Sequence, residues 1–330
     1  MKKQLLIAAV AATMGTAVIA DVSITGNGKF EYFNTQTATT STNKTNTEVN
    51  LQITGKNGDT TVVANYEFSN QGDADGGQAS MDIEDIYMTT KIGDVTVKAG
   101  NYASGTSGIL GEIDEGGRAT NKVTLSGTIG GVSVYAGNSD FGETAASTGL
   151  TTLDGNMFFG ASMDVAGYKV EAKRVSATRD AFGISGDVAG FGVRLETVSN
   201  DAANSDVTFG QINKTVGDVA LTYAFLDVDN TDSLVGETDS AIFAVENGGK
   251  ATARDNMQVS AKTSIAGNTV TVKSGSIDKG ISAAADLDYS QVSVSRALAS
   301  GATFAATYTD KDDSASTDTQ ILELDRSVTF

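Results

Sequence analysis

Three acidic side chains lie close together in the glycine-rich stretch 100–122: Glu112, Asp114 and Glu115. Closely spaced carboxylates can act as a general acid and base, but no nucleophile or other partner residue accompanies them. Carboxylates that line a narrow passage can instead attract cations. Ordinary solvated loop charge is the third interpretation, because charged loop residues are mostly exposed. Long loops between short strands are often functional, which keeps the passage interpretation open.

The composition of the chain removes most catalytic chemistries. The 330 residues include no His and no Cys. Without histidine the commonest general base and transition-metal ligand is missing, and a Ser-His-Asp arrangement cannot form. Without cysteine there are no disulfides, no thiol catalysis and no cysteine-bound zinc. We therefore expect that the protein is not an enzyme and that it needs no cofactor.

The first 20 residues have the pattern of a secretory signal peptide: two lysines, an apolar run and small residues that end at Ala20. We expect residues 1–20 to be removed and residues 21–330 to form one domain. That domain has 21 basic and 41 acidic residues, a net charge of −20, which argues against nucleic acid as a partner. No later apolar run is long enough for a spanning helix, so in a membrane the chain must form a closed barrel.

Apolar and polar residues alternate from Asp21 onward, which predicts half-buried β-strands. In YKVEAKRV the polar face carries a ladder of charges, Lys169, Glu171 and Lys173, and Arg194 holds a similar place in FGVRLETV. A soluble sandwich turns its polar face outward, whereas a transmembrane barrel turns it toward the lumen. Alternation leaves both folds open. The ladder is either an ion-pair network that stiffens a wall or a contact for solutes.

The connections between these segments separate the two folds. One set is tight and built on residues that tolerate positive φ: Asn57-Gly58-Asp59, Gly93-Asp94, Gly130-Gly131, Ala166-Gly167, Ala189-Gly190, Gly217-Asp218, Gly267-Asn268 and Ser300-Gly301. The intervening set is mostly longer: residues 34–46, 69–80, 101–121, 139–155, 228–255 and 311–318, with short connections at 177–180 and 200–205. Short turns on one side and long loops on the other are typical of outer-membrane barrels. Eight tight turns and a strand at each end predict eighteen strands.

One of the long connections has the oxygen spacing of the start of a calcium loop, with Asp227, Asp229 and Asp232. The later glycine and the closing glutamate of an EF-hand are missing, so that motif is not supported. A weakly bound divalent cation such as Ca²⁺ at these three residues is one hypothesis, because hard cations need only clustered oxygens. The alternative is a solvated loop.

Residues 21–330 resemble the general (non-specific) porins of Gram-negative outer membranes. The resemblance rests on Gly28-Lys29 in the first strand, on the hairpin IYMTTKIGDVTVKAGN before the third long loop, and on the last strand, QILELDRSVTF, which ends in Phe330. Val328 and Phe330 fit the alternating C-terminal signal that the barrel-assembly machinery recognises in that family.

Two features depart from the family pattern. Arg326 stands where the family usually has an apolar residue, and it either reaches the membrane interface or faces a subunit contact. General porins usually have 16 strands, whereas the turns predict 18.

The resemblance implies an all-β fold: a transmembrane antiparallel β-barrel of 16–18 strands, assembled as a homotrimer, whose third loop folds into the lumen. Glu112, Asp114 and Glu115 would form the acidic side of the constriction. The basic candidates on the wall are Lys29, Lys98, Lys122, Lys169, Lys173 and Arg194. Opposed charges would orient dipolar solutes, and the net charge predicts mild cation selectivity.

The function that follows is an outer-membrane porin through which small hydrophilic solutes and ions diffuse. Its expected partners are itself, outer-membrane lipid with lipopolysaccharide, its solutes and the barrel-assembly machinery. The alternative is a secreted or surface-attached β-rich adhesin or structural protein, which would share the leader and the acidic, Gly/Thr/Asn-rich composition. The terminal Phe330 and the asymmetry of the connections favour the porin.

Overall fold

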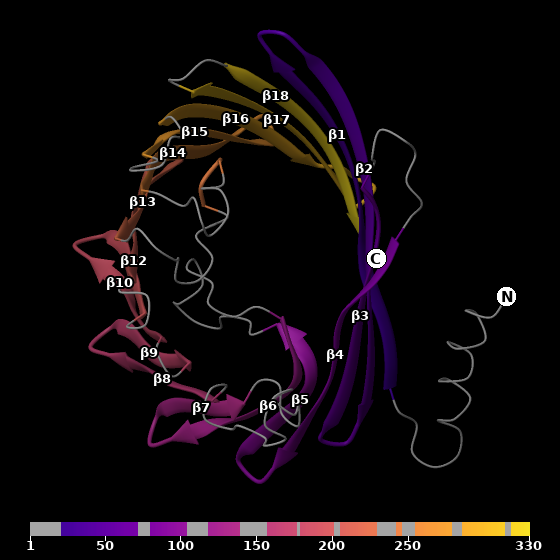
Figure 1. The fold of residues 1–330 in the computed structure, drawn as a ribbon, viewed down its shortest axis with the longest axis vertical. Coiled ribbons are helices and arrows are strands. Elements are labelled where there is room, and N and C mark those ends of the chain that lie inside the picture. Colours follow the sequence, from indigo (N-terminus) through magenta and orange to yellow (C-terminus); the bar gives the residue numbers. More distant parts are fainter. Residues whose placement is uncertain are drawn as a thin grey trace, which may run out of the picture.

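Eighteen antiparallel strands form one closed sheet in the computed structural model (Figure 1). The structure describes residues 21–71, 80–103, 118–138, 157–176, 179–200, 205–229, 242–245, 255–278, 286–313 and 318–330. The strands are β1 (Asp21–Thr37), β2 (Ser41–Asn57), β3 (Thr60–Gln71), β4 (Ser80–Ile92), β5 (Val95–Ala103), β6 (Arg118–Ile129), β7 (Val132–Asn138), β8 (Met157–Val165), β9 (Tyr168–Ser176), β10 (Arg179–Val188), β11 (Phe191–Asn200), β12 (Ser205–Val216), β13 (Val219–Asp229), β14 (Asp255–Ile265), β15 (Asn268–Asp278), β16 (Leu287–Ala297), β17 (Ala302–Asp313) and β18 (Thr319–Thr329). Each strand pairs with the next along the chain, so the fold is a meander.

The sheet closes between its first and last strands, because β18 pairs with β1 from Asn27–Thr329 to Thr37–Thr319. Two backbone hydrogen bonds extend this seam beyond the strand: Gly26 N–H donates to Phe330 O, and Phe330 N–H donates to Gly26 O, both at 2.9 Å. Closure leaves no unpaired strand edge, which a barrel in lipid requires. The eighteen strands that the turns predict are therefore confirmed, and the family's usual sixteen does not apply to this chain.

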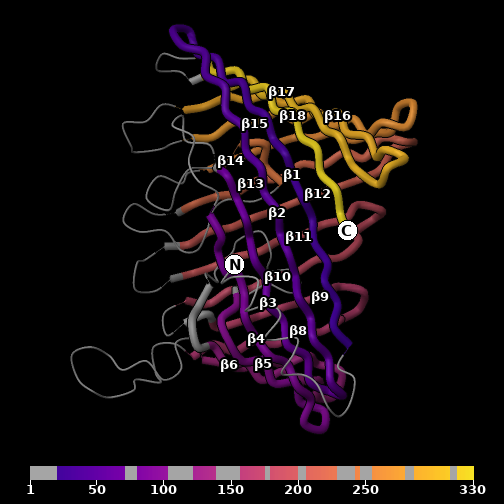
Figure 2. Tube along the Cα trace, turned by 90° about the vertical axis from the view of Figure 1, so that its right-hand side faces the viewer, coloured from indigo at the N-terminus to yellow at the C-terminus, as the bar shows by residue number. Residues whose placement is uncertain are grey.

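All eight tight turns follow even-numbered strands, so they lie at one end of the barrel, and Figure 2 shows the strands running obliquely between the two ends. Each turn has a residue with positive φ, such as Gly58 (58°) and Gly217 (59°). At three turns an alanine precedes the glycine and also has positive φ: Ala166, Ala189 and Ala266. This backbone twist is the one that two-residue hairpins need.

The prediction of a loop over residues 34–46 is wrong, because only 38–40 separate β1 from β2. The two strands pair out to Gln36–Ser41 and form a long hairpin (Figure 2). Cross-strand side-chain bonds support it: Asn34 Nδ2 donates to Asn43 Oδ1 at 2.7 Å, and Tyr32 Oη donates to the same oxygen at 2.9 Å. Threonine favours strands, so the many threonines here indicated extension and not a loop.

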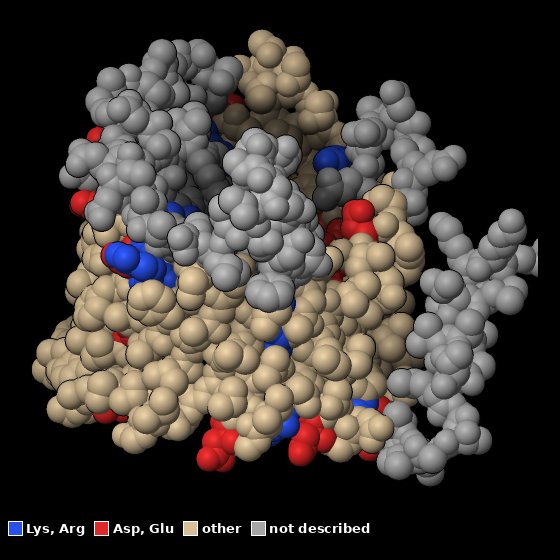
Figure 3. All heavy atoms as spheres, turned by 60° about the horizontal axis from the view of Figure 1, so that its bottom comes forward, with Lys and Arg blue, Asp and Glu red and all other residues tan. Residues whose placement is uncertain are grey.

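The outer surface of the barrel is predominantly apolar. Large exposed hydrophobic side chains are found on strands all around it, including Ile24 on β1, Phe159 on β8 and Val259 on β14. In the side that Figure 3 presents, most of the wall carries no charge and charged residues gather along the lower edge. A surface of this kind suits lipid and would be a liability in water. No helix among the described residues is long and apolar enough to cross a membrane.

Candidate functional site: the lumen of the barrel

The inner face of the wall can be identified from a short segment, Ile242–Val245, that lies inside the ring of strands (orange in Figure 1). Phe243 packs there against Val207 and Phe209 of β12 and Leu226 of β13. Directly paired residues of neighbouring strands share a face, so the pairing register extends this assignment around the barrel. The inner face defined in this way is the one that carries most of the charged side chains of the strands.

All six basic residues predicted for the wall lie on this inner face: Lys29 (β1), Lys98 (β5), Lys122 (β6), Lys169 and Lys173 (β9) and Arg194 (β11). They are not equivalent. Lys29 forms an ion pair with Glu31, and Arg194 forms one with Glu196, which is fully buried. A cation whose charge is balanced by a neighbouring carboxylate has little effect on a solute in the lumen. These two cations are therefore expected to act mainly as neutralised pairs.

The inner face of β18 and β1–β4 forms an acidic arc, made of Glu31, Glu48, Glu67, Asp82, Asp85, Glu323 and Asp325. Three of these, Glu31, Glu323 and Asp325, have carboxylate oxygens within 4.8 Å of one another across the β1–β18 seam. Asn46 Nδ2 donates to Glu31 Oε2 at 2.9 Å, and Asn65 Nδ2 donates to Asp85 Oδ2 at 3.0 Å. This arc also contains four cations: Lys29, Lys44, Lys56 and Lys91.

The inner face of β5–β11 forms the opposing basic arc, made of Lys98, Lys122, Lys169, Lys173, Arg179 and Arg194. It includes two buried carboxylates, Glu171 and Glu196. Figure 1 shows β1–β3 and β7–β10 on opposite sides of the ring. The two arcs therefore face each other across the lumen, and the wall alone supplies the opposed charges that the sequence assigned in part to the third loop.

Aromatic rings hold the first two lysines of the basic arc. The Lys98 ammonium lies 3.9 Å from the ring centroid of Tyr87 and 4.0 Å from that of Tyr102. Lys122, only 2% exposed, lies 4.8 Å from the Tyr102 centroid and 4.9 Å from that of Phe158. Such contacts favour a cation without neutralising it. This stack sits beside both ends of the third long connection, since Tyr102 is in β5 and Lys122 is in β6.

The segment Ile242–Val245 belongs to the long connection between β13 and β14, and sequence reasoning missed its role. Phe243 is 7% exposed, and Val245 packs against Ile277, Leu287 and Tyr289 on the inner face of β15 and β16. The available signal was the composition of β12 and β13. Val207, Phe209 and Leu226 are apolar at inward positions, although outward positions of the same strands, such as Ile212 and Leu221, are apolar as well. A strand that is apolar on both faces is covered on both faces.

Polar side chains of β14 and β15 complete the attachment of this segment. Gln258 Nε2 donates to Ile242 O at 2.7 Å, and Gln258 Oε1 accepts from Ala244 N–H at 2.7 Å. Lys273 Nζ also donates to Ile242 O, at 2.9 Å. The wall thus satisfies backbone groups that would otherwise be orphaned in an apolar contact, and the segment is held as part of the lumen wall.

Two predicted sites fall wholly or partly outside the described residues. The acidic residues of the third loop, Glu112, Asp114 and Glu115, lie in 104–117, which the structure does not describe. Of the proposed cation ligands, Asp227 is exposed at the outer end of β13; Asp232 and the side chain of Asp229 are not described. Both sites stay predictions.

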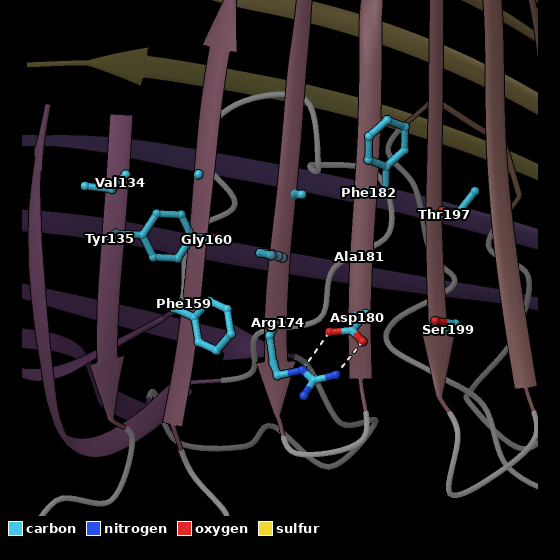
Figure 4. Close-up of a pocket in the computed structure, with 13 residues that line it drawn as sticks. Val134, Tyr135, Phe159, Gly160, Arg174, Asp180, Ala181, Phe182, Thr197 and Ser199 are labelled. Carbon is cyan, nitrogen blue, oxygen red and sulfur yellow. Dashed lines mark hydrogen bonds and ion pairs between the residues drawn. The ribbon is translucent and has the colours of Figure 1, made fainter. Parts of the chain in front are cut away.

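A hollow of about 820 Å³ adjoins the wall at β7–β11 (Figure 4). Small residues such as Ala161 and Ala172 line it, and so do Phe159 and Phe182. Arg174 lies at one end, but its Nε and Nη2 donate to the two carboxylate oxygens of Asp180 at 2.8 and 2.7 Å. Because that guanidinium is already paired, the hollow offers less chemistry than the two arcs of the lumen.

The closed barrel with an apolar outside and a charged inside defines a transmembrane β-barrel of the outer-membrane type. No protein-family model matches the chain, and no curated protein matches it by sequence. Its fold is shared with solved outer-membrane structures at low sequence identity. The outer membrane protein OpdK from Pseudomonas aeruginosa is 12% identical with a TM-score of 0.67, and the match covers 94% of this chain and 98% of that one.

Two further structures give the same result. OccK2 (OpdF) from Pseudomonas aeruginosa, solved in complex with glucuronate, is 11% identical, with a TM-score of 0.66 and coverage of 94% and 97%. OccAB4 from Acinetobacter baumannii is also 11% identical, with a TM-score of 0.64 and coverage of 94% and 98%. The expected barrel fold is confirmed. The likeness is to Opd and Occ outer-membrane proteins, so the narrower resemblance to general, non-specific porins is not supported.

Proposed function

We propose that this protein is an outer-membrane channel through which small hydrophilic solutes and ions diffuse passively. One observation carries the proposal: eighteen strands close into a barrel that is apolar toward lipid and charged toward the lumen. A polar lumen in a barrel of this size accommodates water and hydrated solutes. The mechanism requires no catalysis and no cofactor. The adhesin alternative is less well supported, because an adhesin has no need for an apolar belt around a closed barrel.

The filter of this channel is proposed to be the pair of arcs together with the inward segment Ile242–Val245. The segment narrows the lumen on the side of β12–β16, and the arcs act on the charge of whatever passes. The third-loop residues Glu112, Asp114 and Glu115 are proposed to add to the acidic side. Carboxylates on one wall and ammonium groups on the other orient a dipolar solute as it passes.

The solutes are proposed to include molecules of either charge sign. OccK2, which shares the fold, was solved with glucuronate, and the basic arc of this chain offers the cations that a sugar carboxylate would meet. The net charge is a poor guide to selectivity, because many aspartates, such as Asp206, Asp255 and Asp288, point away from the lumen. We propose that the cation preference is mild and comes from the acidic arc.

The assembly of the channel is also part of this proposal. We propose a homotrimer in contact with outer-membrane lipid and lipopolysaccharide, inserted by the barrel-assembly machinery after removal of residues 1–20. The role of Val328 and Phe330 in that insertion is supported by their place at the closing seam. Val328 faces outward, and the backbone of Phe330 bonds to Gly26.

Conductance of the detergent-purified protein in a planar bilayer tests the proposal. Discrete current steps, and a reversal potential in a potassium chloride gradient that indicates mild cation preference, are expected. Three equal sub-steps would support the trimer. Folding is verified on detergent gels, where a folded barrel migrates differently before and after heating. A folded barrel that inserts into the bilayer without giving current would refute the channel proposal. Current without ion selectivity would support the channel proposal but contradict the proposed charge filter.

A further inference from the structure

Arg326 interrupts the apolar outer surface of the last strand. Its neighbours in the register are Phe30 of β1 and Phe304 of β17, both exposed on the lipid side. Along β18 the flanking outward residues are Leu324 and Val328. An arginine on the lipid face is costly near the bilayer midplane and nearly neutral at the interface. Arg326 lies four residues before the end of the chain, about 13 Å along the strand, which places it near the end with the tight turns.

A second outward arginine lies beside it. Arg296 of β16 pairs with Phe304, which pairs with Arg326, so the two arginines flank one phenylalanine in the same row. Two strand spacings separate their Cα atoms by about 9.6 Å, a distance that two arginine side chains can close from either side. Both side chains are exposed. Within the described part of the chain, neither guanidinium has an ion pair or hydrogen bond.

The carboxylates nearest in sequence cannot neutralise these arginines. Glu323 and Asp325 alternate with Arg326 along β18 and therefore point into the lumen, where they belong to the acidic arc. The outward surface toward the middle of the barrel is apolar: the next row contains Val294, Ala306 and Leu324. Ala306, the middle residue of this row, is smaller than Val294 and Leu324 on either side of it. Two unpaired guanidiniums therefore lie next to an apolar surface that extends toward the middle of the barrel.

We propose that Arg296 and Arg326 bind the phosphate of a glycerophospholipid in the periplasmic leaflet. The lipid's acyl chains would lie over the apolar row that contains Ala306, and its phosphate would accept hydrogen bonds from both guanidiniums. Arginine suits this role because its planar fork of donors matches phosphate oxygens and because it is less strongly hydrated than lysine. The tight turns define the periplasmic end in barrels of this type, so the leaflet is the one that contains phospholipid headgroups. This binding site is separate from the lumen and from the proposed transport.

Other outward cations of the described chain differ from this pair and supply controls. Arg174 is paired with Asp180. Lys214, on β12, lies 3.9 Å from the ring centroid of Phe191 and has no second cation in its row, where its β13 partner is Leu221. Lys214→Gln thus removes one outward charge at the same end of the barrel without touching the proposed site.

Native mass spectrometry of the detergent-purified full-length protein tests the proposal. The probes are phosphatidylglycerol and diacylglycerol, which lacks the phosphate, with the same acyl chains, titrated against the wild type and the double variant Arg296→Gln/Arg326→Gln. We expect the wild type to prefer phosphatidylglycerol by about tenfold, the scale of a charge-assisted hydrogen bond. The double variant should lose that preference, and Lys214→Gln should keep it. Arg326→Lys should retain part of it.

Several results would overturn the proposal. These are a wild type without headgroup preference, a double variant that keeps it, or an equal loss in Lys214→Gln. Stronger retention of lipid A than of phosphatidylglycerol would also overturn it, because the site would then serve the other leaflet. If the double variant does not fold, the wild-type comparison and Arg326→Lys still decide. Unchanged conductance of the folded double variant separates this outcome from any failure of the channel proposal.

Discussion

The acidic and basic arcs of the lumen carry opposite charges and are also built differently. In the acidic arc, carboxylates share hydrogen bonds with amides, as in Asn46–Glu31 and Asn65–Asp85. In the basic arc, aromatic rings surround lysines, as Tyr87 and Tyr102 surround Lys98. A hydrogen bond from an amide spreads the negative charge over a polar network, whereas an aromatic face attracts an ammonium through the charge distribution of its ring.

Because the two arcs are built differently, we expect them to contribute to different properties of the channel. Apart from Glu31, which is buried, the carboxylates of the acidic arc are half-buried or exposed and stay accessible to passing cations. Lysines packed between rings are partly withdrawn, and Lys122 is almost fully so. We therefore expect the acidic arc to dominate ion selectivity and the basic arc to contribute more to the stability of the wall. The following variants test that division.

The largest structural change is expected from releasing the inward segment that covers the wall beyond the basic arc. Phe243→Asp places a charge in the apolar contact with Val207, Phe209 and Leu226, where it has no partner. The segment should leave the wall, and single-channel conductance should rise by about a factor of two. Phe243→Leu keeps the contact apolar and is the control. Equal conductance in all three proteins would show that the segment does not limit the pore.

Neutralising the acidic seam should shift selectivity. In Glu31→Gln/Glu323→Gln/Asp325→Asn the ratio of potassium to chloride permeability should fall about threefold, since three charges within one screening length of the pathway are lost. The reversal potential in a salt gradient measures this. A ratio that does not move would mean that the acidic arc lies outside the ion pathway.

The opposite change in the basic arc should have the opposite sign and a smaller size. Lys98→Gln/Lys173→Gln removes two lumen-facing cations and should raise the permeability ratio by less than about twofold at 0.1 M salt. The same reversal-potential experiment compares it with the acidic variant. A shift as large as that of the acidic seam would contradict the view that aromatic packing withdraws Lys98 from the ion pathway.

Loss of the buried lysine should instead be seen in stability. Lys122→Gln removes the contacts with Tyr102 and Phe158 and should lower the free energy of unfolding by about 1–2 kcal/mol, the range for desolvated cation–π pairs. Urea unfolding of the barrel in lipid vesicles measures it. Lys214→Gln, which removes a contact with one ring only, should cost less. A larger loss of stability in Lys214→Gln than in Lys122→Gln would contradict the structural role of the aromatic stack.

The smallest effect is expected outside the lumen. Arg174→Gln breaks the pair with Asp180, whose side chains are 40% and 50% exposed, and such surface pairs contribute at most about 1 kcal/mol. Selectivity should not change, because this pair lies on the outer face. A shifted reversal potential in this variant would mean that outer charges influence the current and that the arcs alone do not explain selectivity.

The general plan of the barrel was readable from the sequence because its signals are local. A period of two fixes which residues share a face, and Gly-centred turns such as those at Gly58 and Gly217 fix the hairpins. Counting those turns predicts eighteen strands. The inward placement of Lys169, Lys173 and Arg194 follows from the same alternation. The failure at residues 34–46 came from treating Thr-rich and Asn-rich sequence as a loop, although threonine favours strands.

The arcs, the aromatic stack and the inward segment depended on the tertiary structure, because residues far apart in sequence form each of them. Glu31 and Glu323 meet only when the first and last strands close the barrel. Phe243 finds Val207 and Leu226 only when its connection turns inward, and alternation says nothing about the path of a long connection. Alternation along the chain indicated which residues of a strand share a face, since that depends on neighbours in the sequence. Closure of the sheet decided which charges face each other, since that depends on the curvature of the whole wall.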